Sequence, residues 1–189
     1  MTASVGMRLV EGLAARGVSV VFGIPGVHTV ELYRGLAGGT LRHVTARHEQ
    51  GCAFMADGYA RASGKVGVAF VITGPGVLNA LTAMAQAKAD SVPMLVISGV
   101  NAQPTLGRGL GHLHEMPDQS GLVAALCPTR TIYEAADLGP ALDWAFTTMT
   151  GARPTPVHLQ IPTEVMPLPC PPLPAPANAP PRPQARAAP

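Results

Sequence analysis

Short apolar runs rich in β-branched residues alternate with longer helical patterns along most of this 189-residue chain. Runs that are apolar on both faces are typical of strands in a parallel sheet buried between two layers of helices. The alternation predicts an α/β domain of the three-layer αβα kind, with a doubly wound, six-stranded parallel sheet. The predicted strands are 19–22, 42–44, 66–72, 93–98, 129–133 and 157–161, and the predicted helices are 5–16, 27–37, 49–63, 77–89, 119–126 and 135–150.

The alternating pattern stops after Pro162, where proline becomes frequent: 11 of the 20 prolines lie between Pro162 and Pro189. Proline fixes φ and lacks an amide donor, so this stretch predicts an extended, semi-rigid spacer rather than a helix or a sheet strand. We therefore expect a folded domain over residues 1–166 and a Pro-rich linker or tail over residues 167–189. A longer protein cut or truncated here, a solvated terminus, or a docking motif for a proline-binding module would each have such a tail.

Charge, cysteine usage and hydropathy exclude several classes of protein. Residues 1–166 hold 11 basic and 11 acidic side chains, so the basic excess of a nucleic-acid-binding protein is missing. The three cysteines are far apart and form no C-x-x-C pair, which excludes a disulfide framework. No apolar run is long enough to span a membrane and no secretory pattern occurs, so we expect a cytoplasmic protein. Because only 13% of the residues are charged, we expect a partner to cover part of the surface.

In a doubly wound sheet, ligands bind at the carboxyl ends of the strands. This rule directs attention to four loops, at residues 23–26, 46–49, 73–76 and 99–117. They contain no metal-ligand spacing, nucleophile elbow or phosphate-binding lysine motif. The sequence Thr73-Gly-Pro-Gly76 follows a strand and opens a helix, so its amides could hold an anion. A tight turn from strand to helix explains this sequence more simply.

Glu49 follows a predicted strand and begins a predicted helix whose next residues are mostly small or apolar. Stabilisation of a first-turn acidic side chain by the helix dipole would explain this position by itself. The apolar surroundings, however, would also desolvate the carboxyl group. Desolvation favours the neutral acid whereas the helix amides favour the anion, and a group held between these influences suits proton transfer near neutral pH. Glu49 is therefore the main candidate for a catalytic residue.

Three motifs occur in a fixed order: Phe22-Gly-Ile-Pro-Gly26, the stretch Arg47-His-Glu-Gln-Gly-Cys-Ala-Phe-Met-Ala-Asp-Gly-Tyr-Ala-Arg-Ala-Ser-Gly64, and Thr73-Gly-Pro-Gly-Val-Leu-Asn79. Over about residues 3–166 the chain resembles the pyrimidine-binding domain of thiamine-diphosphate enzymes of the acetolactate synthase and 2-oxo acid decarboxylase group. The sequence Leu113-His-Glu-Met-Pro-Asp118 suggests a closer similarity to bacterial 2-oxo acid decarboxylases, including those that act on 5-guanidino-2-oxopentanoate.

The resemblance implies a role for Glu49 and a cofactor, thiamine diphosphate. Glu49 matches the family glutamate that hydrogen-bonds N1′ of the aminopyrimidine, which favours the imino tautomer that removes the proton from C2 of the thiazolium. The cofactor then supplies the difficult chemistry, and the protein supplies positioning and proton control. The resemblance also implies that four further residues line the pyrimidine, although turn and cap roles would explain them as well. These residues are Pro25, Thr73, Pro75 and Asn79.

His114 lies where synthases of the family usually have Phe-Gln-Glu and where some decarboxylases have paired histidines, whereas this chain has Leu113-His-Glu115. The resemblance therefore implies that His114 contacts the 2-oxo acid substrate as a proton donor. A histidine exposed to water in a loop is the alternative interpretation. The departure from Phe-Gln-Glu also argues against a simple acetolactate synthase.

The resemblance further implies partners. The family holds the diphosphate and Mg²⁺ on a second domain marked by Gly-Asp-Gly and Asn-Asn, which this sequence lacks, so the partner would be a diphosphate-binding domain or subunit. Small residues along 51–60 would let another helix approach, which fits a homodimer. We expect the chain to be inactive alone, as the N-terminal part of a larger enzyme. A natural small subunit of a split 2-oxo acid decarboxylase and a non-catalytic α/β assembly module are the alternatives.

Overall fold

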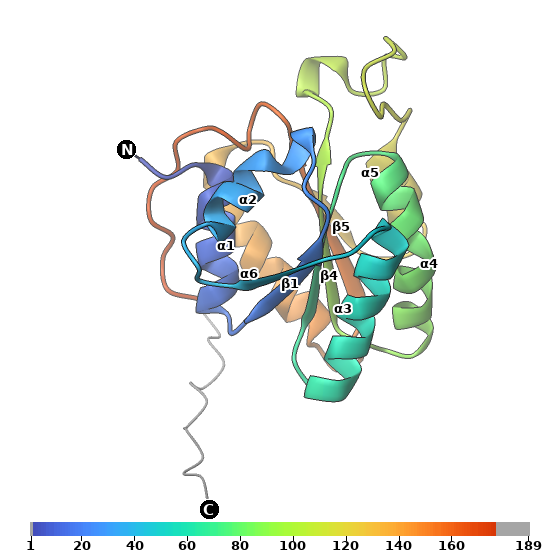
Figure 1. Cartoon of the computed structure of the whole chain (residues 1–189). Coiled ribbons are helices and arrows are strands. Elements are labelled where there is room, and N and C mark those ends of the chain that lie inside the picture. The colour runs from blue at the N-terminus through green and yellow to red at the C-terminus, as the bar shows by residue number, and fades with distance from the viewer. Residues whose placement is uncertain (1, 177–189) are drawn as a thin grey trace, which may run out of the picture.

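A computed structural model describes residues 2–176, and it confirms the predicted α/β fold with one six-stranded, all-parallel sheet (Figure 1). The strands lie in the order β2-β1-β3-β4-β6-β5. Their bounds are β1 Val20–Gly23, β2 Arg42–Thr45, β3 Gly67–Val71, β4 Met94–Val100, β5 Thr129–Thr131 and β6 Pro156–Pro162. The helices are α1 Val5–Ala15, α2 Val30–Leu36, α3 Glu49–Ser63, α4 Pro75–Ala89, α5 Gln119–Ala124 and α6 Leu138–Met149.

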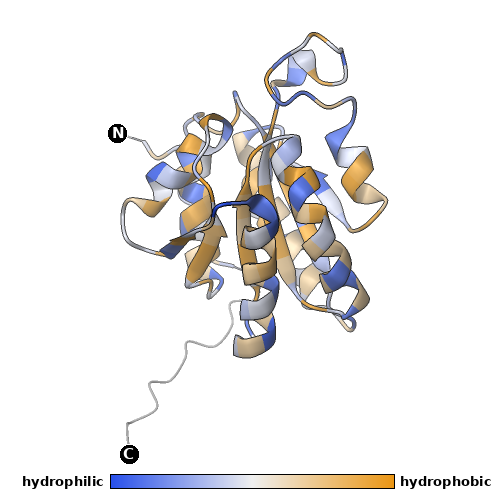
Figure 2. Ribbon diagram, turned by 45° about the vertical axis from the view of Figure 1, so that its right-hand side comes forward, coloured by the Kyte–Doolittle hydropathy of each residue, from blue (hydrophilic) through white to orange (hydrophobic). Residues whose placement is uncertain are grey.

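Helices cover both faces of the sheet, which gives the three layers that the sequence predicts. Helices α1, α2 and α6 lie on one face, and α3, α4 and α5 lie on the other (Figure 1). Each face has its own apolar cluster, so the strands are buried from both sides. Figure 2 shows these central strands mostly in orange, as expected for strands that no water reaches. The two clusters make the sheet a rigid platform for the loops at its edge.

The order of the strands sets the position of a crevice. The chain runs from β1 to β2 on one side of β1 and then returns to β3 on the other side. β1 and β3 are direct neighbours, with Phe22 opposite Ala69 and Gly23 opposite Phe70. The connections therefore diverge at the carboxyl ends of these two strands, which is the point where doubly wound sheets bind ligands. The loop after β1 and the turn after β3 both start at this point.

The ends of the helices follow from local sequence. His48 precedes α3, and its Nδ1 accepts a hydrogen bond from the Gln50 amide at 3.2 Å. Helix α3 ends at Gly64, whose φ of 69° is in the left-handed region that glycine tolerates. Helix α4 begins at Pro75, two residues before the predicted start at residue 77, because proline suits the first position of a helix. The predicted helices at 27–37 and 135–150 begin instead with 3-10 turns.

Residues 166–173 pack on α1 instead of extending away from the domain. The Val5 amide donates to the Leu168 carbonyl at 2.9 Å, and the Cys170 amide donates to the Ala3 carbonyl at 2.9 Å. Cys170 is buried, and Leu173 packs against the cluster under α1 and α6. The division of the chain at residue 166 stays a prediction, and residues 177–189 of the predicted tail lie outside the described residues. Among residues 2–176, no helix combines the length and hydropathy that crossing a membrane requires.

Candidate functional site

Glu49 is the first residue of α3 and lies half-buried at the carboxyl edge of the sheet. The side-chain amide of Asn79, on α4, donates a hydrogen bond to Glu49 Oε2 at 3.0 Å. Oε1 has no hydrogen-bond partner among residues 2–176. Asn79 therefore fixes the orientation of the carboxyl group through one oxygen, and the other oxygen can accept or hold a proton from outside the domain.

Two glycines allow the surrounding loops to meet beside Glu49. A Cβ atom on Gly26 or on Gly76 would lie only 2.7 Å from the side chain of Ile72. The same position on Gly76 is 3.5 Å from Cγ of Glu49. The loop after β1, which contains Pro25, and the turn after β3 thus both pack on Ile72. Pro25 and Pro75 are exposed at this edge.

Cys52 lies one turn of α3 after Glu49 and is fully buried. Burial raises the pKa of Cys52 to about 11, and the negative charge of Glu49 adds to the rise. The thiol is therefore neutral near pH 7 and packs as a small apolar group. The carboxyl of Glu49 is therefore the candidate reactive group at this end of α3.

The turn from Thr73 to Gly76 connects β3 to α4 and has a backbone conformation that requires glycine. Gly74 has φ 62° and ψ −107°, and a Cβ atom there would overlap the carbonyl oxygen of His114. Thr73 is 1% exposed, and its Oγ1 is buried without a hydrogen-bond partner within residues 2–176. The loop that carries His114 thus packs directly on the turn that precedes Asn79.

His114 lies in the long loop between β4 and α5, which projects from the sheet edge in Figure 1. Its φ of 58° is in the left-handed region, which is unusual for a residue other than glycine. The loop is held by Asn101, whose amide donates to the Leu113 carbonyl at 3.0 Å, and by the Glu115 carboxylate, which accepts from the amides of Leu110 and His112. Glu115 therefore closes the loop, and His114 faces the other way, onto Gly74.

A second histidine, His28, lies next to His114. Their ring centroids are 5.9 Å apart with the rings almost perpendicular, and Nδ1 of each ring is buried without a partner in the described part of the chain. Burial, and in addition the neighbouring His114, lowers the pKa of His28. The sequence analysis did not single out His28. Its position just after Pro25-Gly26, at the carboxyl end of the first strand, is the signal that could have identified it.

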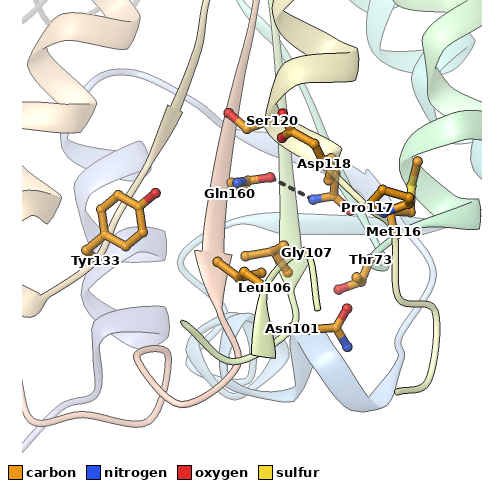
Figure 3. A pocket seen from close by; sticks show the side chains of 12 residues that line it. Thr73, Asn101, Leu106, Gly107, Met116, Pro117, Asp118, Ser120, Tyr133 and Gln160 are labelled. Atoms are coloured by element: carbon orange, nitrogen blue, oxygen red, sulfur yellow. Dashed lines mark hydrogen bonds between the residues drawn. The ribbon is translucent and has the colours of Figure 1, made fainter. Parts of the chain in front are cut away.

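A cleft of about 230 Å³ opens beside this cluster, between the long loop and the ends of β4 and β6 (Figure 3). Thr73 lines the cleft from one side, and Gln160 lines it from the sheet. The other lining residues are Val100, Asn101, Leu106, Gly107, Met116, Pro117, Asp118, Gln119, Ser120 and Tyr133. Residues 2–176 contain no group of three or more His, Cys, Asp or Glu side chains arranged to hold a metal ion.

The structure therefore brings most of the predicted site residues to one edge of the sheet. Glu49 and Asn79 are hydrogen-bonded, Thr73 and Pro75 belong to the turn beside them, and the carbonyl of His114 lies against that turn. A family model described as "Thiamine pyrophosphate enzyme, N-terminal TPP binding domain" matches residues 3–122. The chain belongs to this family.

Curated relatives of this thiamine pyrophosphate enzyme domain are larger proteins. The chain is 54% identical over 173 residues to a probable 2-ketoarginine decarboxylase of Pseudomonas aeruginosa, a match that covers 89% of this chain and 30% of that protein. It is 37% identical over 169 residues to the acetolactate synthase large subunit of Parasynechococcus marenigrum, covering 87% of this chain and 27% of that one. The large subunit of Escherichia coli acetolactate synthase isozyme 2 is 36% identical over 158 residues, with 83% and 28% covered. The chain thus spans less than a third of these relatives.

Proposed function

We propose that this chain forms the pyrimidine-binding half of a thiamine-diphosphate site in an enzyme that decarboxylates 2-oxo acids, and that Glu49 is the carboxyl group that activates the cofactor. The observation that carries the proposal is the state of the Glu49 carboxyl group. One oxygen accepts a hydrogen bond from Asn79, and the other has no partner among the described residues. Family membership independently supports the cofactor. When bound, thiamine diphosphate would supply the carbon nucleophile and accept the electrons released as carbon dioxide leaves.

The described residues fit an aminopyrimidine. Such a ring needs a carboxyl group at one ring nitrogen and apolar contacts to its faces. Glu49 Oε1 offers the first, and the packed side chain of Ile72 with the exposed rings of Pro25 and Pro75 offers apolar surface at the same edge. Glu49 would hold the proton at N1′, and Asn79 would keep the carboxyl group facing the ring. A side chain fixed in this way loses little freedom when the ring binds.

His114 and His28 are our candidates for the groups that contact the substrate. Their Nε2 atoms make no hydrogen bond within residues 2–176, while their Nδ1 atoms are buried. A proton on a buried and unpartnered Nδ1 would be unfavourable, so the neutral rings carry their hydrogen on Nε2, from which they can donate a hydrogen bond. We infer that His114 donates a hydrogen bond to the 2-oxo acid, and that His28 supports it.

The substrate is proposed as a 2-oxo acid, and 5-guanidino-2-oxopentanoate is the first to be tested. The relative that is 54% identical is named a probable 2-ketoarginine decarboxylase. 2-Ketoarginine is another name for 5-guanidino-2-oxopentanoate. The acetolactate synthases are more distant, at 36–37% identity. The sequence Leu113-His-Glu115, in place of Phe-Gln-Glu, agrees with this ranking. Decarboxylation of the compound would be measured as release of carbon dioxide, with pyruvate as the comparison substrate.

We further propose that the diphosphate and Mg²⁺ are held by a separate domain or subunit, and that the outer face of α3 and α4 packs against a second copy. This face carries Phe54, which is 41% exposed, and Leu78, which is 44% exposed. Gly58 lies between them in the sequence, with open space where a Cβ atom would be. Exposed apolar side chains beside small residues suit close helix packing. The cytoplasmic location stays a prediction.

The homodimer is tested with Phe54→Asp. A charge in the centre of an apolar interface is unfavourable, so we expect the variant to sediment as a monomer at concentrations where the original chain is a dimer. Leu122→Asp, at an exposed leucine on α5, is the matched control and should leave the dimer intact. A Phe54→Asp variant that remains dimeric would remove the α3–α4 face from the proposal.

Glu49 is tested with Glu49→Gln in the assembled enzyme, meaning this chain joined to a diphosphate-binding part. Such an enzyme can be built by replacing the matched 30% of the Pseudomonas relative with this chain. We expect Glu49→Gln to keep the fold and to slow hydrogen–deuterium exchange at C2 of the cofactor by roughly 10²- to 10⁴-fold, because the amide cannot hold the proton at N1′. Glu11→Gln, an exposed acid on α1, should have no effect. An unchanged C2 exchange rate in Glu49→Gln would refute the assignment.

A further inference from the structure

Gln119 is a buried amide that connects the turn beside Glu49 to the interior of the sheet. It is the first residue of α5 and is 3% exposed. Its Oε1 accepts a hydrogen bond from the Gly74 amide at 2.7 Å, across 45 positions of sequence. Its Nε2 donates to the Gly99 carbonyl at 3.0 Å and to Gln160 Oε1 at 2.9 Å, the bond drawn in Figure 3.

The orientation of this amide is fixed by its neighbours. The Gly74 amide can only donate and the Gly99 carbonyl can only accept, so Gln119 points Oε1 to the first and Nε2 to the second. Gln160 then presents its oxygen to Gln119, and its own Nε2 donates to Thr131 Oγ1 at 2.8 Å. A flipped Gln119 would place its NH₂ group against the Gly74 amide, donor against donor, and its oxygen against two acceptors. Gln119 can therefore make these bonds in one orientation only. Buried amide networks of this kind are rigid when every member is satisfied.

Gly74 is the residue of the turn that most needs such an anchor. Its backbone angles, φ 62° and ψ −107°, differ from both the strand before it and the helix after it. Its amide nitrogen is bound by Gln119, and its Cα faces the carbonyl of His114 at close approach. These contacts hold Gly74 between the interior of the sheet and the loop of His114.

The position of Gly74 sets the start of α4. Pro75 is the first residue of that helix, Gly76 packs beside Cγ of Glu49, and Asn79 one turn later donates to Glu49 Oε2. We propose that Gln119 is a positioning residue that holds the Thr73–Gly76 turn and thereby keeps Asn79 and Glu49 aligned for proton transfer. This proposal rests on the proposed function of Glu49.

The tether is tested first by amide hydrogen exchange in this chain, without cofactor. Gln119→Met removes the acceptor at similar size, so we expect the Gly74 amide to exchange roughly tenfold faster, as loss of one hydrogen bond predicts. Amides in the middle of β4, at Val96 and Ile97, should keep their protection, which shows that the fold is intact. Gln119→Glu keeps an oxygen toward Gly74, and burial beside two acceptors favours its protonated form, whose O–H can replace the donor Nε2. It should therefore stay within about threefold of the original chain. If Gln119→Met unfolds, the exchange rate of the Gly74 amide in Gln119→Glu still tests the proposal.

Thr131→Val is the matched control, because it removes a hydrogen bond from the same network without touching Gln119. It should leave the exchange of Gly74 unchanged. Gly74 protection that is the same in Gln119→Met as in the original chain, or that is lost equally in Thr131→Val, would overturn the proposal. Loss of protection at the Gly74 amide in Gln119→Glu, with the amides of β4 still protected, would also overturn it.

The consequence for function is tested in the assembled enzyme. We expect Gln119→Met to slow C2 exchange by roughly tenfold or more while changing KM for the 2-oxo acid less than twofold, since misplacement of a catalytic group acts on the reaction step. Gln119→Glu should recover most of the rate. A normal C2 exchange rate with a loosened Gly74 would refute the positioning role and leave Glu49 unaffected. A Glu49→Gln variant without effect would instead refute the proposed function itself.

Discussion

Buried histidine nitrogens in two regions of this domain have opposite surroundings. Between β4, β5 and β6, His158 is fully buried and both ring nitrogens are paired, Nε2 with Ser98 Oγ at 2.9 Å and Nδ1 with Thr129 Oγ1 at 2.8 Å. At the carboxyl ends of β1 and β3, by contrast, Nδ1 of His28, Nδ1 of His114 and Oγ1 of Thr73 are buried without partners among residues 2–176.

The difference separates polar side chains that stabilise the fold from those that we propose are available to a ligand. An unpaired buried polar group costs free energy, so a fold selected for stability alone would pair or remove it. The paired side chain of His158 joins β4, β5 and β6 and stabilises the sheet. Three of the five unpaired buried side-chain atoms of residues 2–176, those of His28, His114 and Thr73, lie at the carboxyl edge of the sheet, where its topology predicts a binding site. Substitutions in the two regions should therefore have different effects on stability.

The largest effect is expected for His158→Leu, which tests the paired region. The substitution removes two hydrogen bonds and leaves Ser98 and Thr129 with fewer partners, so the free energy of unfolding should fall by about 3 kcal/mol. Urea unfolding at pH 7 measures this. His112→Leu, at an exposed histidine, should change stability by less than about 0.5 kcal/mol. Equal effects of the two substitutions would contradict a structural role for His158.

A smaller effect is expected from pH, and it depends on the same residue. Burial lowers the pKa of His158 to about 3, from 6.5 in an unfolded chain. Below pH 6.5 the unfolded chain therefore binds a proton that the folded chain does not, and stability falls as the pH falls. The contribution of His158 should steepen as the pH falls from 6.5 to 5 and approach about 1.4 kcal/mol per pH unit. His28, whose pKa is also lowered, adds in the same direction. Urea unfolding across this window should show a shallower slope in His158→Leu, whereas an unchanged slope would mean that another group dominates.

The smallest effect is expected for His28→Leu, which tests the unpaired region. Because Nδ1 of His28 has no partner within the described residues, its loss removes no hydrogen bond, and stability should change by about 0.5 kcal/mol or less in either direction. The same urea titration measures it. A loss as large as that of His158→Leu would show that His28 has a structural role and would end the distinction between the two regions.

Sequence reasoning predicted the fold, which the structure confirms, and the position of Glu49 at the start of a helix after a strand, because both depend on local patterns. Alternating apolar runs give the six strands, and Glu49 is recognisable as the first residue of a helix after a strand. Gln119 could not be found in this way, because its bond to Gly74 joins residues 45 positions apart that meet only in the folded sheet. Proline density likewise predicts a spacer after Pro162, whereas the packing of Cys170 and Leu173 depends on α1 and α6.

The most direct measurement is a crystal structure of the assembled enzyme with thiamine diphosphate bound. We expect Oε1 of Glu49 to lie within about 2.6–3.2 Å of N1′ of the aminopyrimidine, while Oε2 still accepts the hydrogen bond from Asn79. A Glu49 side chain turned into solvent, or paired with a basic residue away from the ring, would contradict the central claim.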